Sequence, residues 1–205
     1  MQTYKINTQE EMEQFKDDLG FNVDGNLEVN CTLDFKGRLL VKGYLLIKAG
    51  YSIKAGGWIE AGSWIEAGIW IKAGSWIEAG DSIEAGYSIQ AGGSIEAGDS
   101  IEAGSWIEAG DWIKAGSWIE AGSSYGISAG LQITCKGILK YGLKCFAGVC
   151  VWREITDEEK TITCGKHEGG RIEYGILCET GLEESKITEC VIKGKTYKVK
   201  ILEEC

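Results

Sequence analysis

Residues 65–76 read Ile-Glu-Ala-Gly-Ile-Trp-Ile-Lys-Ala-Gly-Ser-Trp, and this six-residue phrase recurs with small changes from Ile47 to Gly122. A period of six fits neither an amphipathic helix of 3.6 residues per turn nor a heptad, and a glycine in each repeat would cost a helix ~1 kcal/mol. We therefore exclude a helix here. The isoleucine keeps its spacing without exception at Ile53, Ile59, Ile65, Ile71, Ile77, Ile83, Ile89, Ile95, Ile101, Ile107, Ile113 and Ile119.

Each repeat reads as one short strand followed by a corner. Trp64, Ile65, Glu66 and Ala67 alternate outward and inward, as a strand does, and Gly68 supplies a permissive backbone for a bend. Such a strand has no hairpin partner nearby, so its hydrogen bonds must come from the same wall one coil away. The sequence therefore predicts an all-β chain built as a parallel β-solenoid, with coils ~4.8 Å apart.

The repeat resembles that of the hexapeptide-repeat proteins. Their pattern places a small or acidic residue after an aliphatic one and a second small residue further on, and residues 65–68 and 101–106 fit it. The resemblance implies a left-handed parallel β-helix with three hexads in each triangular coil. It concerns the fold and not the acyltransferase activity of many members.

We predict three units along the chain: an N-terminal cap (1–21), the hexapeptide-repeat β-helix (22–151) and a small C-terminal β-rich unit (152–205). In the β-helix we align the earlier residues Val23, Val29, Phe35, Val41 and Ile47 with the later isoleucines, which gives about seven coils. The eight residues from Ile119 to Ile127 imply a two-residue insertion near Ser123 and Ser124.

The two terminal units carry different signals. Thr3–Ile6 reads as a strand and Thr8–Leu19 as a helix, with Thr8 as N-cap and Glu11 as its capping-box partner. The helix face of Met12, Phe15 and Leu19 would cover the open first coil. Near the C-terminus, Gly194-Lys195 between two apolar stretches predicts a β-hairpin. This unit either closes the solenoid or forms a separate contact surface.

Composition restricts the compartment and the partners. No stretch of the 205 residues is apolar enough to span a membrane, and the N-terminus does not read as a signal peptide, so we expect a cytoplasmic protein. The eight cysteines then read as reduced thiols, with Cys31 and Cys135 at alanine positions. The net charge of -10 argues against direct binding of nucleic acid, and it permits competition for a basic surface on another protein.

The chemistry-bearing residues favour no enzyme and no cofactor. Acyltransferases of this repeat family depend on a histidine general base, and the one histidine here, His167, lies outside the repeats. Zinc prefers four soft ligands in a tetrahedron. A conceivable but weak zinc quartet has an unfamiliar spacing, and we favour independent buried thiols over it; its members are Cys164, His167, Cys178 and Cys190.

Tryptophan occupies the position before the isoleucine in two groups of repeats, separated by four repeats with serine. Each indole must point outward beside an inward isoleucine, which predicts two Trp bands around the rod with a serine waist between them. Large exposed apolar surfaces usually mark contacts, and Trp is enriched in binding hot spots. The predicted contact residues are Trp58, Trp64, Trp70 and Trp76 in one band and Trp106, Trp112 and Trp118 in the other.

With three hexads per coil, every eighteenth residue shares a wall. One wall then carries a column of Glu66, Glu84, Glu102 and Glu120, a second carries Glu60, Glu78 and Glu96, and the third reads Lys54, Lys72, Gln90 and Glu108. We expect a non-enzymatic protein-binding rod, in a specific version an inhibitor of the phage anti-CRISPR type that occupies a basic nucleic-acid-binding surface. The alternative is a structural protein that associates with itself, for example as a homodimer, through its Trp faces.

Overall fold

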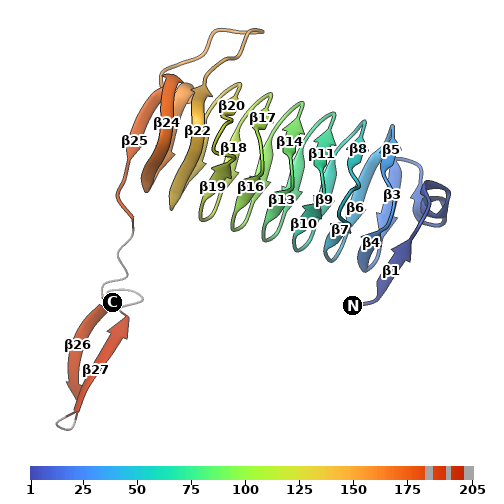
Figure 1. Cartoon of the computed structure of the whole chain (residues 1–205), viewed down its shortest axis with the longest axis horizontal. Helices are drawn as coiled ribbons and strands as arrows, with labels where there is room; N and C mark the ends of the chain where they lie inside the picture. Colours follow the sequence, from blue (N-terminus) through green and yellow to red (C-terminus); the bar gives the residue numbers. More distant parts are fainter. Residues whose placement is uncertain (183–186, 193–194, 201–205) are drawn as a thin grey trace.

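The computed structural model describes the backbone of residues 1–182, 187–192 and 195–200, and the side chains of residues 1–182. The chain forms a parallel β-solenoid of about nine turns with almost no helix (Figure 1). This confirms the predicted fold class. No helix in the described ranges is both long and apolar enough to cross a lipid bilayer.

Three walls of parallel strands make up the solenoid, and we call them A, B and C. Wall A contains β1 (Thr3–Ile6), β4 (Asn26–Val29), β7 (Leu45–Ile47), β10 (Ile65–Ala67), β13 (Ile83–Ala85), β16 (Ile101–Ala103) and β19 (Ile119–Ala121). Wall B contains β5 (Leu33–Phe35), β8 (Ile53–Ala55), β11 (Trp70–Ala73), β14 (Ser88–Ala91), β17 (Ile107–Ala109) and β20 (Ile127–Ala129). Wall C contains β3 (Gly20–Val23), β6 (Arg38–Val41), β9 (Ile59–Ala61), β12 (Ile77–Ala79), β15 (Ile95–Ala97), β18 (Ile113–Ala115), β21 (Ile133–Cys135), β23 (Thr161–Cys164) and β25 (Ile176–Glu179). The longer strands β22 (Ile138–Ala147) and β24 (Lys166–Tyr174) each run from wall A into wall B.

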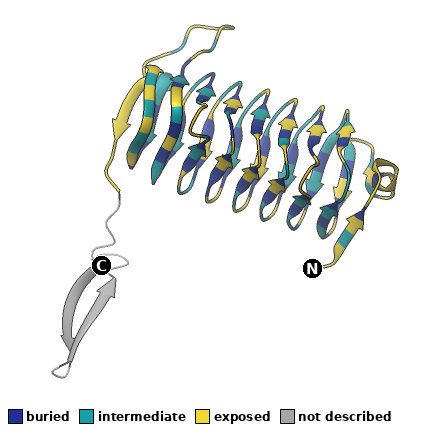
Figure 2. Ribbon diagram, in the orientation of Figure 1, coloured by how far each residue is buried: buried dark blue, intermediate teal, exposed yellow. Residues whose placement is uncertain are grey.

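The inward positions of the repeat form one continuous core. The isoleucines from Ile53 to Ile119 are fully buried, and the alanines two residues further on are at most 3% exposed. Like residues stack on like, since Ile83 pairs with Ile65 and with Ile101. Figure 2 shows the resulting alternation of buried and exposed positions along the strands.

The corner glycines are required by the closeness of the coils. The Gly98 N–H donates to the carbonyl of Ala79 at 3.1 Å. A Cβ at Gly98 would lie 1.9 Å from the carbonyl oxygen of Gly80 in the coil before, which no side chain can tolerate. A glycine in each hexad therefore permits the coils to stack at hydrogen-bonding distance.

The first coils differ in phase from the alignment that we predicted. Leu45 pairs with Ile65 and Ile47 pairs with Ala67, so the leucines take the isoleucine positions and the valines the alanine positions. Two additional residues near Gly50 cause the shift, because Gly50 has φ +87° and the chain turns there with a hydrogen bond from Tyr51 N–H to the Lys48 carbonyl. The fully buried leucines are Leu27, Leu33, Leu39 and Leu45.

The structure also tests the predicted positions of Cys31 and Cys135 and the predicted insertion near Ser123. Cys31 is half-buried at a corner and not at an alanine position, so its prediction as a core residue was wrong. Cys135 pairs with Ala115 and is buried, as predicted. Ser123 and Ser124 form an exposed corner between β19 and β20, which confirms the two-residue insertion.

The N-terminal helix is shorter and tighter than predicted. It is a 3-10 helix, η1 (Gln9–Phe15), and Thr8 makes no side-chain cap, although Glu11 accepts a hydrogen bond from Asn7 N–H at 2.8 Å. The next residues, β2 (Lys16–Asp17), leave the helix because they pair antiparallel with β3. Leu19 is consequently 61% exposed, whereas Met12 is buried in the first coil. The segment lies between β1 of wall A and β3 of wall C, where later coils have a wall B strand.

Parallel stacking continues beyond residue 151. After an excursion at residues 148–160, which includes η2 (Glu158–Lys160), β23 pairs with β21, β24 with β22 and β25 with β23. These strands and the N-terminal coil raise the number of turns to about nine, where the hexad count predicted seven. Near the C-terminus, β26 (Ile187–Ile192) and β27 (Lys195–Lys200) pair antiparallel, which confirms the predicted hairpin.

Replacing the fully buried Ile83 with aspartate should lower the free energy of unfolding by about 4 kcal/mol or more, because the change removes core contacts and buries a polar group without a partner. Thermal unfolding followed by circular dichroism measures the effect. Glu84→Asp, at the neighbouring outward position, should leave the transition almost unchanged. An Ile83→Asp variant with the melting curve of the wild type would contradict the inward placement of the isoleucines.

Candidate functional site

The seven tryptophans of the two predicted bands lie at the three corners of the solenoid. We name each corner by the walls that it joins, so that the A/B corner precedes the strands of wall B. Trp64 and Trp118 lie at the C/A corner, Trp70 and Trp106 at the A/B corner, and Trp58, Trp76 and Trp112 at the B/C corner. Backbone hydrogen bonds align each column: Ile65 N–H donates to the Ser82 carbonyl, and Ile83 N–H to the Ser100 carbonyl. The serines Ser82, Ser88, Ser94 and Ser100 occupy the same columns between the two Trp bands.

Most of the indoles lie against neighbouring coils. Trp58 stacks on Trp76 with ring centroids 4.5 Å apart, and Trp64 stacks on Tyr44 at the same distance. Five of the seven are half-buried, while Trp112 and Trp118 are 38% and 42% exposed. The bands therefore surround the rod and form no single flat face. That they bind a partner stays a prediction.

The glutamate columns have the register that the eighteen-residue period predicted. On wall A, Glu66 pairs with Glu84, Glu84 with Glu102 and Glu102 with Glu120; on wall C, Glu60 pairs with Glu78 and Glu78 with Glu96. Lysines follow only at one end of each column. Lys140 pairs with Glu120 and Lys114 with Glu96, both at 2.6 Å.

Partial burial and mutual repulsion perturb the middle of both columns. Desolvation raises the pKa of Glu102, and the charges of Glu84 and Glu120 raise it further. The pKa of Glu78 is raised in the same way, first by desolvation and then by Glu60 and Glu96. Ionisation of both carboxylates therefore carries an electrostatic cost in the folded chain.

Walls A and C meet at the C/A corner, where two aspartates add to the negative charge. Asp81 and Asp99 lie in successive coils, and Asp81 accepts a hydrogen bond from the Ser63 hydroxyl at 2.5 Å. The exposed Trp118 lies at the same corner. We call this surface the acidic edge; it comprises Glu60, Glu66, Glu78, Asp81, Glu84, Glu96, Asp99, Glu102 and Glu120.

The sequence analysis missed a second surface, which we call the apolar edge. At the A/B corner the position two residues before the buried isoleucine or cysteine carries an exposed apolar side chain in every coil from Tyr51 to Leu143 except that of Ser105, whereas the C/A corner has Gly, Ser and Asp there. The sequence contained this signal, because Tyr51, Ile69 and Tyr87 recur every eighteen residues and Tyr125 and Leu143 follow the two-residue insertion at the same spacing. The edge comprises Tyr51 (37% exposed), Ile69 (37%), Tyr87 (41%), Tyr125 (36%) and Leu143 (58%).

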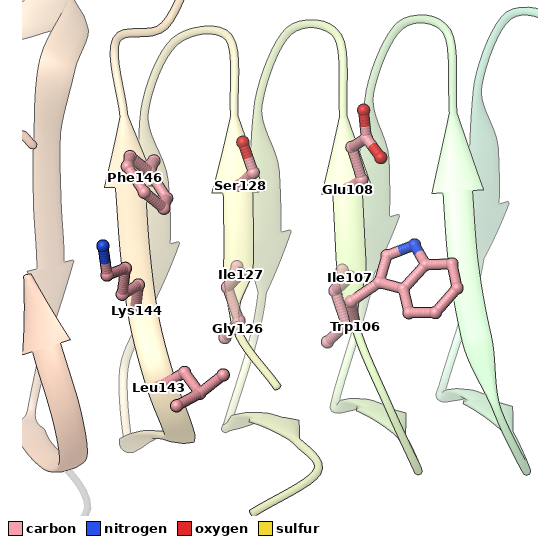
Figure 3. Close-up of a pocket in the computed structure, with 9 residues that line it drawn as sticks. All are labelled: Trp106, Ile107, Glu108, Gly126, Ile127, Ser128, Leu143, Lys144 and Phe146. Carbon is pink, nitrogen blue, oxygen red and sulfur yellow. The ribbon is translucent and has the colours of Figure 1, made fainter. Parts of the chain in front are cut away.

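Two hollows open on wall B beside the apolar edge. One, of about 350 Å³, lies over Ser88 between Trp70 and Trp106. The other, of about 300 Å³, lies over Gly126, where the absence of a side chain leaves a space between Trp106 and Leu143 (Figure 3). Lys54 and Lys72 line the first hollow, and Glu108 and Lys144 line the second.

Comparisons with models of protein families, with curated proteins and with solved structures all find no match. A function must therefore be inferred from the surfaces described above.

The cysteines of the predicted zinc quartet that the structure describes, Cys164 and Cys178, do not point toward a common site. Thr163 pairs with Cys178 and Cys164 pairs with Glu179, so Cys164 and Cys178 lie on opposite faces of wall C. Cys164 is fully buried and Cys178 is exposed. Cys190 lies outside the residues whose side chains are described. Among those that are described, no three His, Cys, Asp or Glu side chains form a metal-binding group.

The buried thiols Cys135, Cys145 and Cys164 are poorly suited to nucleophilic chemistry. Burial raises the pKa of Cys145 and of Cys135 to about 12 and that of Cys164 to about 11. The protonated thiol is a weak nucleophile, so these cysteines behave as small core residues. His167 packs against the buried Tyr141 ring, with centroids 5.2 Å apart, and its Nε2 is buried without a hydrogen-bond partner among the described residues.

Glu102→Gln should raise the free energy of unfolding at pH 7 by about 0.5 kcal/mol, because it removes a like charge that faces two others. The pKa of Glu102 is raised in the folded state, so the wild type gains stability as the pH falls through that value. The advantage of the variant should therefore disappear in acid. Urea denaturation at several pH values measures it.

Glu108→Gln is the matched control, since the column neighbours of Glu108 are Gln90 and Ser128 and carry no charge. It should give no comparable gain. A Glu102→Gln variant that is less stable than the wild type at pH 7, or equally stabilised at every pH, would contradict the repulsive column.

Proposed function

We propose that the protein is a non-enzymatic binding rod whose acidic edge docks on a basic surface of another protein. The observation that carries this proposal is the register of the two glutamate columns, which flank Asp81 and Asp99 on one side of the rod. Nine carboxylates lie along this edge, and among the described side chains lysines pair with them only at Glu96 and Glu120. A rigid strand spacing fixes their separation, so a complementary basic surface meets a preformed array.

The electrostatic repulsion within the glutamate columns supports a role in binding. Like charges that face each other on neighbouring strands destabilise a sheet, and alternation with lysine would relieve them. The outward position between the buried isoleucine and alanine of each strand can hold other residues, because wall B carries Lys72, Gln90 and Glu108 there in successive coils. Retention of the glutamates on walls A and C alone therefore favours a surface that a cationic partner neutralises.

The partner class that fits the charge best is a protein that binds nucleic acid. A rod with a net charge of -10 and an array of regularly spaced carboxylates can compete with phosphates for a basic groove. In this role the protein is an inhibitor that acts in the cytosol, comparable in shape and charge to phage-encoded anti-CRISPR proteins. The comparison is an analogy and comes from no sequence match.

The repeat supports a structural similarity to the hexapeptide-repeat proteins. Three strands per coil and inward isoleucines agree with that group, and we extend the proposal to its left-handed winding. Buried thiols of high pKa support a chain without the acyltransferase activity of the group. The proposed rod needs no cofactor.

Replacing Glu84 and Glu102 with lysine should slow association with the partner at least about tenfold, because both changes lie in the middle of the acidic edge and reverse its steering field. The partner is first captured from cells of the native host at low salt, and association rates are then measured by surface plasmon resonance from low to high salt. The wild-type rate should fall steeply as salt rises.

Glu10→Lys with Asp18→Lys is the matched control, with the same change of charge on exposed residues of the N-terminal segment. It should bind almost as the wild type does, and added DNA or RNA should displace the wild type from the partner. A rate that is insensitive to salt, or equal effects of the two double variants, would remove the acidic edge as the binding surface.

A further inference from the structure

The apolar edge is an exposed stripe, interrupted at the coil of Ser105, that no described part of the chain covers. Its members belong to neighbouring coils, and their backbones are linked: Ile69 N–H donates to the Tyr51 carbonyl and Tyr87 N–H to the Ile69 carbonyl. Tyr87 and Tyr125 further pack against Trp106, with ring centroids 5.1 and 6.1 Å from it. An apolar stripe of this length on one side of a rod is typical of a protein contact.

Wall B, which borders this edge, carries charges of both signs in a definite order. Its outward residues from the N-terminal side are Asp34, Lys54, Lys72, Gln90, Glu108, Ser128 and Phe146. Lys54 is already paired with Asp34 at 3.0 Å, and Gln90 donates to Glu108 at 3.1 Å. Lys72 is exposed and has no ion-pair partner in the described part of the chain.

When this row of residues is set against a second copy of itself that runs in the opposite direction, opposite charges meet. If two copies face each other through wall B in opposite directions, with the two-fold axis at the coil of Gln90, Lys72 of one copy lies opposite Glu108 of the other. The same pairing occurs twice, since a two-fold contact uses each residue pair in both directions. A parallel arrangement would instead place Lys72 opposite Lys72 and Glu108 opposite Glu108.

The apolar edge agrees with the same centre. One coil before Tyr87 the stripe has the exposed Ile69, and one coil after it Ser105 is only 2% exposed, where Tyr87 and Tyr125 pack against each other with ring centroids 6.2 Å apart. Reversal about Tyr87 places Ile69 of one copy over this aromatic pair of the other and brings Tyr51 opposite Tyr125. The charges of wall B and the apolar contacts of the edge therefore agree on one arrangement.

We propose that the apolar edge and wall B bind a second copy of this chain, in an antiparallel two-fold dimer centred on the coil of Tyr87 and Gln90. The contact spans the five coils from Tyr51 to Tyr125, about 20 Å along the rod. An interface of that length lies at the small end of specific protein contacts, so the dimer dissociates in the micromolar range.

The dimer leaves the acidic edge free. In a solenoid of three walls, the C/A corner lies opposite wall B, so the two acidic edges point away from the interface on opposite sides. The dimer would thus present two copies of the proposed binding surface to a basic partner. The inference does not rest on that function, because the variants that test it change wall B and the A/B corner.

The test measures the molar mass of the full chain by sedimentation velocity at concentrations up to about 100 μM, against the monomer mass of 22.3 kDa. We expect the wild type to dimerise over this range. Lys72→Glu alone and Glu108→Lys alone should each weaken the dimer at least tenfold, since each places like charges opposite each other twice. An equimolar mixture of these two single variants should restore the dimer, because every 72–108 contact then joins opposite charges.

Ile69→Ser tests the apolar contact and should weaken the dimer without unfolding the chain, because Ile69 is 37% exposed. Lys36→Glu, an exposed lysine at the B/C corner, should dimerise as the wild type does. A wild type that remains monomeric at every concentration would overturn the proposal. So would a dimer that persists in Lys72→Glu and Ile69→Ser, or single variants whose mixture does not recover, because the second copy would then lie elsewhere or in another direction.

Discussion

The close approach of successive coils at the corners is the constraint on which the rest of the structure depends. A Cβ at Gly98 would lie 1.9 Å from the Gly80 carbonyl oxygen, so the coils of the regular repeats stack this closely because glycine returns at every sixth residue. The backbone ladder that results holds Ile83 between Ile65 and Ile101. Burial of these isoleucines, each stacked on the isoleucine of the next coil, then stabilises a core that runs along the rod.

The same constraint determines the surface. Since each coil repeats the last at a fixed spacing, any outward residue type that recurs every third hexad becomes a column. Glutamates on walls A and C thus give the acidic edge, and aromatic and aliphatic residues at the A/B corner give the apolar edge. The two surfaces differ in chemistry and in direction, so one chain can associate with itself and still offer charge to a partner.

The sequence predicted those features that depend on the repeat alone. Alternation and period were sufficient for the strands, the buried isoleucines and the register of Glu84 with Glu102. The phase of Leu45 could not be found by hexad alignment, because the turn at Gly50 adds two residues and leucine replaces isoleucine on the N-terminal side of it. The coils after residue 160 were missed for a similar reason, since the excursion and longer strands break the period. The column of Tyr51, Ile69 and Tyr87 could have been predicted from the sequence, because these residues recur every eighteen residues, but the six-residue repeat alone does not place them on one corner.

One measurement tests the coil register most directly. The hydroxyl oxygens of Ser82 and Ser100 lie 3.0 Å apart across neighbouring coils, and strands ~4.8 Å apart allow a disulfide between cysteines at these positions. The account predicts that Ser82→Cys with Ser100→Cys cross-links nearly completely under mild oxidation, as read by mass spectrometry of the linked peptides. Ser82→Cys with Ser94→Cys, closer in sequence but on different corners, should not cross-link. Equal cross-linking of the two pairs, or none in the first, would contradict the eighteen-residue register from which both edges follow.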